Sequence, residues 1–156
     1  MTIILLLKVT HIIAAILFLG NISVAILWKT LADKSRDRIR IVHTFDGIIK
    51  SDSVFTIPAV TLLIITGFGL AGMMKLSIIE TGWIFLSIIL VIISGVLYSI
   101  KVGPVQKKIY SLAKDETKFN WAEYESLSKQ WNLWGSIATI TPYIALIFMV
   151  YKYAIL

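Results

Sequence analysis

Four long apolar runs alternate with polar segments along the chain. The runs cover about residues 3–28, 53–74, 82–101 and 133–153. An α-helix rises ~1.5 Å per residue, so a bilayer core of about 30 Å takes roughly 20 residues. Each run is long enough to cross a membrane once, and the pattern therefore predicts four transmembrane helices.

Two of the polar segments are amphipathic. The first, about residues 36–50, places Ile41, Phe45 and Ile48 on one helical stripe with charged residues opposite. The second, about residues 104–129, mixes charges of both signs with aromatic side chains, which is typical of a membrane interface. We expect both segments to be helical on the cytoplasmic side. The pattern leaves open whether the first is continuous with the second span.

Basic residues distinguish the two sides of the membrane. Lys and Arg are frequent between the first and second runs and between the third and fourth, whereas the remaining connection holds only Lys75. The positive-inside rule assigns both basic segments to the cytoplasm. The sequence therefore predicts an all-α integral membrane protein, a single antiparallel four-helix bundle over residues 1–156 with its N- and C-termini outside.

The amino-acid composition narrows the class of protein further. Of the 156 residues, 58% are hydrophobic and 15% are charged, which excludes an ordinary soluble domain. The absence of cysteine excludes disulfides, thiolate metal sites and cysteine nucleophiles. The net charge of +6 is explained by the basic segments beside the spans, so no nucleic-acid partner is expected. The N-terminal segment lacks the features of a cleaved signal, and we expect the first span to be retained.

His11 interrupts the first apolar run. It lies about eight residues from the outer end of that helix and hence ~12 Å deep, within hydrocarbon. A helical projection places it on one face with Ala14, Ala15 and Phe18, and less closely with Asn21. Polar residues in spans normally point into the bundle, so we expect this face to be inward.

Three roles remain open for His11 on this basis. It can donate an inter-helix hydrogen bond to a residue at similar depth, such as Thr66, Thr141 or Tyr143. It can bind the iron of a haem b, since neutral imidazole is a common axial ligand. It can also handle a proton or a substrate.

The second histidine, His43, lies ten residues before the second span and is expected at the inner surface near Asp46. The two axial ligands of one haem lie at nearly the same height, whereas the levels of His11 and His43 differ by ~15 Å or more. One haem shared by both histidines is therefore not expected.

Asn21 and Asp52 are the other polar candidates, in the inner half of the first span and at the inner mouth of the second. Both side chains are placed to line a cavity that opens to the cytoplasm. The alternative is that Asn21 joins helices and Asp52 caps a helix after a bend. The sequence has no glycine-rich phosphate loop, no paired carboxylates within a span and no histidine–carboxylate metal motif, and it leaves open whether the protein is an enzyme.

Three stretches of the chain resemble, in order and spacing, a bacterial family of four-span integral membrane proteins, domain of unknown function 2269. They are LLLKVTHIIAAILFLGN, KSDSVFTIPAVTLLIITGFGLA, and VGPVQKKIYSLAKDE running on to SLSKQWNLWGSIATITPYIALIFMVYK. The most specific part is the pattern of Asp52, Phe55, Thr56, Pro58, Thr66 and Gly67. The resemblance implies the four-span fold and the bacterial inner (cytoplasmic) membrane, and it brings no established activity.

The first helix is also similar to that of the HemJ-type protoporphyrinogen oxidases, small haem-binding bundles, through Lys8, His11 and Gly20. In that family a histidine of this kind is thought to meet haem, which implies a haem site at His11 here. The third helix departs from the family, because Ser87 stands where it has a functional lysine. Related copper-resistance membrane proteins carry similar first-helix histidines.

Three functional expectations follow. The first is a redox subunit that binds a b-type haem or porphyrin, with His11 as the ligand of the haem iron. The second is a non-enzymatic membrane subunit or assembly factor that associates with itself or with a larger complex. The third is a small transporter component in which Asn21 and Asp52 line a path. The lipid bilayer is a partner in all three.

Overall fold

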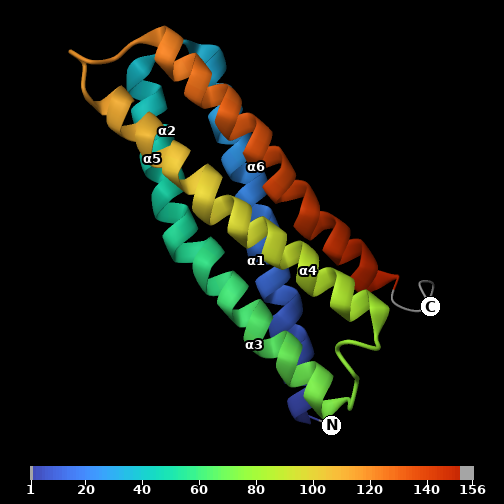
Figure 1. Cartoon of the computed structure of the whole chain (residues 1–156). Helices are drawn as coiled ribbons and strands as arrows, with labels where there is room; N and C mark the ends of the chain where they lie inside the picture. Colours follow the sequence, from blue (N-terminus) through green and yellow to red (C-terminus); the bar gives the residue numbers. More distant parts are fainter. Residues whose placement is uncertain (1, 152–156) are drawn as a thin grey trace.

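The computed structural model describes residues 2–151, and every regular element among them is a helix (Figure 1). The elements in chain order are α1 (Thr2–Ser35), α2 (Arg38–Ser51), η1 (Asp52–Thr56), α3 (Ile57–Met73), α4 (Gly82–Leu97), η2 (Tyr98–Val102), α5 (Gly103–Lys114) and α6 (Trp121–Val150). The two η segments are single π-helical turns. The end of the fourth predicted span, residues 152–153, lies outside the described residues.

The helices join into four continuous rods that are each long and apolar enough to cross a membrane. This confirms the predicted all-α membrane bundle. Two rods are composite. The first runs from Arg38 to Met73 and contains α2, η1 and α3, and the second runs from Gly82 to Lys114 and contains α4, η2 and α5. The amphipathic helix α2 is therefore continuous with the second span, a point that the sequence pattern left open.

Short capped turns join the rods at one end of the bundle. The Asp37 side chain accepts hydrogen bonds from the backbone N–H groups of Ile39 (2.9 Å) and Arg40 (3.4 Å) and so begins α2. Asn120 begins α6 in the same way, with a 2.8 Å bond from Ala122 N–H. We call this end of the bundle, with the turns at residues 36–37 and 115–120, the basic end. The opposite end, with residues 74–81, is the terminal end.

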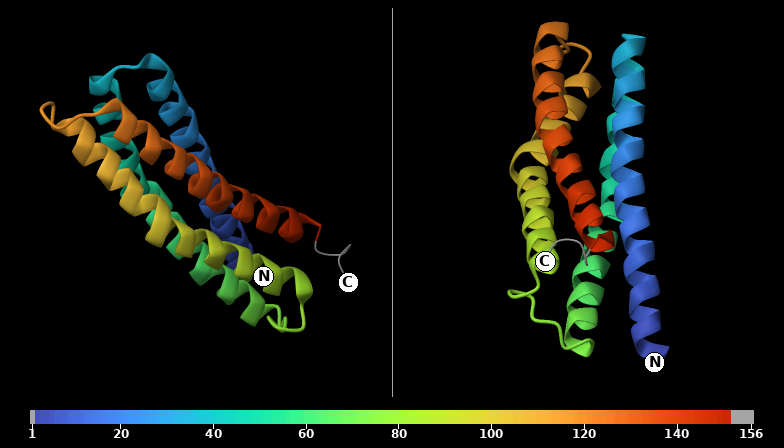
Figure 2. Two further views of the ribbon diagram at one scale, coloured as in Figure 1. Left: turned by 45° about the horizontal axis from the view of Figure 1, so that its top comes forward. Right: turned by 90° about the vertical axis from the view of Figure 1, so that its right-hand side faces the viewer.

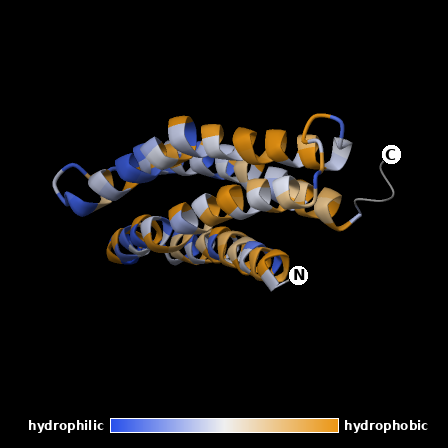
Figure 3. Cartoon of the chain, turned by 90° about the horizontal axis from the view of Figure 1, so that it is seen from below, coloured by the Kyte–Doolittle hydropathy of each residue, from blue (hydrophilic) through white to orange (hydrophobic). Residues whose placement is uncertain are grey.

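The largest apolar core lies at the basic end. Its buried members come from α1, α2, η2, α5 and α6: Ala32, Ile41, Phe45, Val102, Val105, Ile109, Ala113, Tyr124, Trp131 and Ala138. Figure 3 shows hydrophilic residues gathered at this end, while hydrophobic residues cover the rest of the rods. The amphipathic helices α2 and α5 thus pack as in a soluble helical bundle, with their apolar faces inward.

The spanning helices form two separate pairs. Helix α1 packs against α3, and α4 packs against α6, as the right-hand view of Figure 2 shows. Among the described residues, no Cα atom of α3 lies within 8 Å of a Cα atom of α4, although the two helices are consecutive in the chain. Helices α3 and α4 are therefore not neighbours in the bundle. The pairs are joined mainly where α2 packs against α5, with a smaller contact between α1 and α6.

Candidate functional site

His11 bonds across the interface between α1 and α3. Its Nδ1 atom lies 2.8 Å from Oγ1 of Thr66. The Thr66 hydroxyl donates its own proton to the backbone carbonyl of Leu62, at 2.5 Å, as serine and threonine commonly do inside helices. With its own proton given to Leu62, Thr66 accepts from His11 in the tautomer that carries the ring proton on Nδ1 and the lone pair on Nε2. Of the three partners considered from the sequence, the structure selects Thr66.

Gly67 lets the imidazole lie close to α3. A Cβ atom at this position would come within 3.2 Å of Cε1 of His11, which is tighter than ordinary van der Waals contact. The ring is half-buried, so one part of it packs against α3 while another remains exposed at the surface of the helix pair. Together, Thr66 and Gly67 fix the position of the ring against α3.

Asp52 is the centre of a second polar group, and its side chain is only 4% exposed. Its Oδ1 accepts hydrogen bonds from Thr56 Oγ1 (3.0 Å) and Asn21 Nδ2 (3.4 Å). Its Oδ2 accepts from Tyr98 Oη (2.9 Å) and Gln106 Nε2 (3.0 Å). Asn21 also donates to Thr56 Oγ1 at 2.8 Å. The structure thus brings together Asn21 and Asp52, which the sequence analysis had singled out separately.

The Asp52 group extends toward the basic end through Trp131. The indole Nε1 of Trp131 donates to Oε1 of Gln106 at 3.2 Å. The ammonium of Lys29 lies 5.3 Å from the centroid of the Trp131 ring, within cation–π range. A chain of polar and aromatic contacts therefore links Asp52 to a buried lysine.

Lys29 is 1% exposed, and all three of its ammonium protons have an acceptor. Nζ lies 2.6 Å from each of three oxygens, on Asp33, Ser128 and Asn132. Asp33 also accepts from Ser128 (3.1 Å) and from the hydroxyl of Tyr124. These contacts attach α1 to α6 at the basic end.

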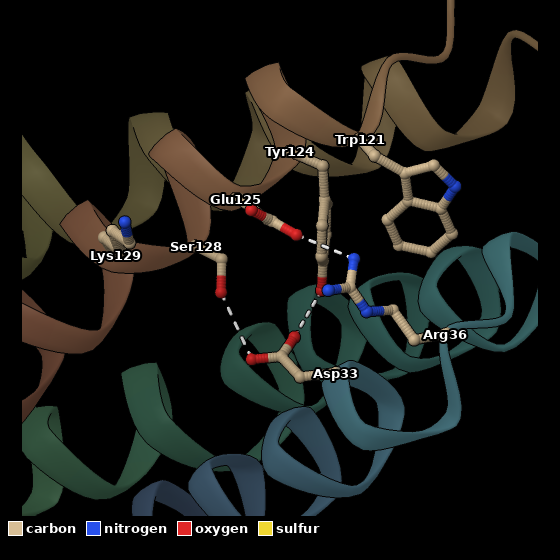
Figure 4. Close-up of a pocket in the computed structure, with 7 residues that line it drawn as sticks. All are labelled: Asp33, Arg36, Trp121, Tyr124, Glu125, Ser128 and Lys129. Carbon is tan, nitrogen blue, oxygen red and sulfur yellow. Dashed lines mark hydrogen bonds and ion pairs between the residues drawn. The ribbon is translucent and has the colours of Figure 1, made fainter.

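Two grooves border these groups. One, of about 300 Å³, is lined by Asp33, Arg36, Trp121, Tyr124, Glu125, Ser128 and Lys129. Figure 4 shows Tyr124 and Ser128 pointing to Asp33, and Glu125 pointing to Arg36, with which it forms an exposed 2.6 Å ion pair. The other groove, of about 370 Å³, lies between α1 and α2 and is lined by Asn21, Val24, Ala25, Trp28, His43, Thr44, Gly47, Ile48 and Ser51.

The two polar groups of the membrane region are separate. Thr56 of the Asp52 group and Thr66 beside His11 are ten residues apart on one continuous rod, or ~15 Å by the helical rise, and the chain between them is mostly apolar. His43 lines the α1–α2 groove together with Asn21 and so lies on the side of the Asp52 group, away from His11. No group of three or more His, Cys, Asp or Glu residues able to hold a metal ion occurs in residues 2–151.

Tyr98, Gln106 and Lys29 were not predicted as site residues from the sequence. One signal was available for Gln106, because it lies beside Val105 and three residues before Ile109, on the apolar side of an amphipathic helix. The sequence places Lys29 among the basic residues that follow the first span. Its burial depends on contacts with α6, which the sequence does not show. Asp52 does not cap a helix after a bend: it lies inside a continuous rod, at the start of η1.

The model of one protein family, described as predicted integral membrane protein (DUF2269), matches residues 5–153. No curated protein and no solved structure matches the chain.

Proposed function

We propose that this chain, which belongs to the family of predicted integral membrane proteins DUF2269, binds a b-type haem or a related porphyrin at His11. The observation that carries the proposal is the orientation of the imidazole. Histidines that bind metals almost always donate their second ring N–H to a fixed acceptor, which sets the tautomer and raises the basicity of the ligand nitrogen. The bond from Nδ1 of His11 to Thr66 is of this kind.

The residues around His11 fit a haem ligand in their donor chemistry. Thr66 uses its own proton on Leu62, so it accepts from Nδ1–H and leaves Nε2 as a lone-pair donor. Gly67 leaves room for the ring against α3, and the ring is half-buried, so part of it is open at the surface of the helix pair. A bound haem would supply one-electron redox chemistry. The protein's part is to hold and orient the ligand nitrogen.

Haem affinity tests this proposal. We expect the purified protein in detergent to bind haemin with a Soret shift, His11→Ala to abolish the shift, and Thr66→Val to weaken binding by roughly 10–100-fold, the usual effect of losing an outer-shell partner. His43→Gln is the matched control and is expected to bind as the wild type does. Equal binding by His11→Ala and the wild type would refute the assignment.

A second candidate function is that of a subunit that assembles in the membrane with a second copy of the chain. The observation that favours it is the lack of contact between α3 and α4, whose apolar side chains Ile65, Phe68 and Ile92 are more than half exposed. Because the chain has no native cysteine, Phe68→Cys can be cross-linked in native membranes without background. A cross-linked dimer is expected, and a purely monomeric product would count against assembly through this face.

A transport role has less support. The polar residues of the Asp52 group and those around His11 are separated by ~15 Å of mostly apolar helix, so the described residues form no continuous polar path between the two groups.

A further inference from the structure

The lysines of η2 and α5 lie in a stretch of chain that has no acidic residue. From Thr81 to Lys114 the sequence contains no aspartate or glutamate, whereas it contains Lys101, Lys107, Lys108 and Lys114. Within residues 2–151, no ion pair joins any of these four lysines to a carboxylate. The segment therefore carries a concentrated positive charge that the rest of the described chain does not neutralise.

Helix α2, which packs against α5, differs in this respect. Each of its three cations has a carboxylate partner: Arg38 pairs with Glu116, Arg40 with Asp37 and Lys50 with Asp46. The positive-inside bias accounts for the side of the membrane on which all these cations lie, but it does not require one helix to be free of acids. The charge of α5 thus calls for a partner from outside the chain.

The height of these lysines along the rod relates them to the bilayer. Residues 82–100 contain no charged side chain and span ~28 Å by the helical rise, close to the ~30 Å thickness of a hydrocarbon core. Lys101 therefore lies at the edge of the hydrocarbon. Lys107 and Lys108 lie ~10 Å further along the same continuous rod, where the headgroup layer of about 5–8 Å ends (Figure 1).

The direction of α5 turns its side chains toward the membrane. In an α-helix every Cα–Cβ bond is tilted toward the N-terminus of the helix. Helix α5 begins beside the span and ends at the basic end, so the long side chains of Lys107 and Lys108 lean back toward the lipid headgroups. Helices α2 and α6 begin at the basic end, and their side chains lean away from the membrane.

The surroundings of the three lysines are fixed. Gln106 and Ile109, which are buried in the bundle, hold the opposite face of α5, while Lys101, Lys107 and Lys108 are exposed. The ammonium of Lys101 lies 5.3 Å from the centroid of the half-buried Trp134 ring on α6. Tryptophan is enriched at the membrane–water interface, which agrees with the height of Lys101.

We infer that Lys101, Lys107 and Lys108 bind the headgroup phosphate of an anionic phospholipid in the leaflet at the basic end. Each ammonium donates charge-assisted hydrogen bonds, and no carboxylate of the described residues competes with the phosphate for them. The acyl chains of the lipid lie beside the apolar surface of α4, directly below the lysines. The inference does not depend on haem binding at His11.

Native mass spectrometry of the protein in detergent tests the inference, with phosphatidylglycerol and phosphatidylcholine of the same acyl chains as the added lipids. Both lipids contain a phosphate, but only phosphatidylglycerol has a net negative charge. We expect the wild type to bind phosphatidylglycerol on the order of 100-fold more tightly, at roughly fivefold for each lysine. The triple variant Lys101→Gln, Lys107→Gln and Lys108→Gln is expected to bind the two lipids alike.

A matched control removes the same number of charges from the far part of the basic end. The variant with Arg40→Gln, Lys114→Gln and Lys118→Gln is expected to keep the preference of the wild type, because these residues lie further from the span. Replacing Lys101, Lys107 and Lys108 by arginine keeps the charges and is expected to keep the preference too. Inorganic phosphate at the concentration of the lipid is not expected to displace it.

Four results would overturn the inference. The first is equal affinity of the wild type for the two lipids, and the second is an equal loss of preference in the two triple glutamine variants, which would show an effect of net charge alone. The third is displacement of the lipid by inorganic phosphate. The fourth is an acidic protein that co-purifies only when the three lysines are present, while neither lipid is preferred. Should the triple variant fail to fold, the pair Lys107→Gln and Lys108→Gln is expected to weaken phosphatidylglycerol binding roughly 25-fold, and an unchanged affinity would count as a fifth.

Discussion

Lys29→Met is expected to lower the free energy of unfolding by about 3 kcal/mol, because it removes a buried cation with three hydrogen bonds and leaves the partly exposed Asp33 without its cation. Lys29 is 1% exposed, and its ammonium donates hydrogen bonds to Asp33, Ser128 and Asn132. The substitution keeps most of the aliphatic stem, so the loss reports the charge and its hydrogen bonds rather than the packing. Reversible denaturant unfolding in detergent, followed by circular dichroism, measures it.

Two further variants separate this effect from a general sensitivity to substitution. Lys34→Met removes an exposed cation from the same helix and is expected to change stability by less than about 0.5 kcal/mol. Lys29→Met combined with Asp33→Asn removes both charges and is expected to recover a large part of the loss, since the orphaned carboxylate accounts for much of it. A double variant no more stable than Lys29→Met alone would show that the ion pair is not the cause.

Phe45→Ala is the second substitution with a large expected effect. Phe45 is fully buried in the core at the basic end and meets Trp131 edge to face, with 6.3 Å between ring centroids. Truncation of a buried phenylalanine costs about 3–5 kcal/mol through lost transfer energy and the cavity left behind. The same unfolding assay measures it. The matched control, Phe68→Ala on α3, removes a side chain that is 52% exposed and is expected to be near neutral. Equal losses in the two variants would contradict a core centred at the basic end.

The spans and the amphipathic segments could be predicted because their signals are local. The length of an apolar run shows directly whether it can span the membrane. The spacing of Ile41, Phe45 and Ile48 shows directly which face of their helix is apolar. The continuity of α2 with α3 and the lack of contact between α3 and α4 could not be predicted, because the pattern of one helix does not say where another lies. The hydrogen bond between His11 and Thr66 could be predicted as one of three candidates, because counting residues along each span places both at a similar depth in the membrane.

The Asp52 group could be predicted only in part from the sequence. Asn21 and Asp52 were recognised as polar residues in or beside spans, but their joint role depends on Tyr98 and Gln106, which come from the other composite rod. Tyrosine and glutamine at a membrane interface are ordinary residues, and only their hydrogen bonds from η2 and α5 to Asp52 make them partners of a carboxylate. The burial of Lys29 was missed for the same reason, since its acceptors lie on α6.

The most direct test of the central claim is the reduced-minus-oxidised visible spectrum of the protein purified from membranes of cells supplied with a haem precursor. A haem held by His11 predicts a Soret band and sharp bands on reduction in the wild type, and their loss in His11→Ala at equal yield of folded protein. A colourless wild type, or the same spectrum in His11→Ala, would contradict it.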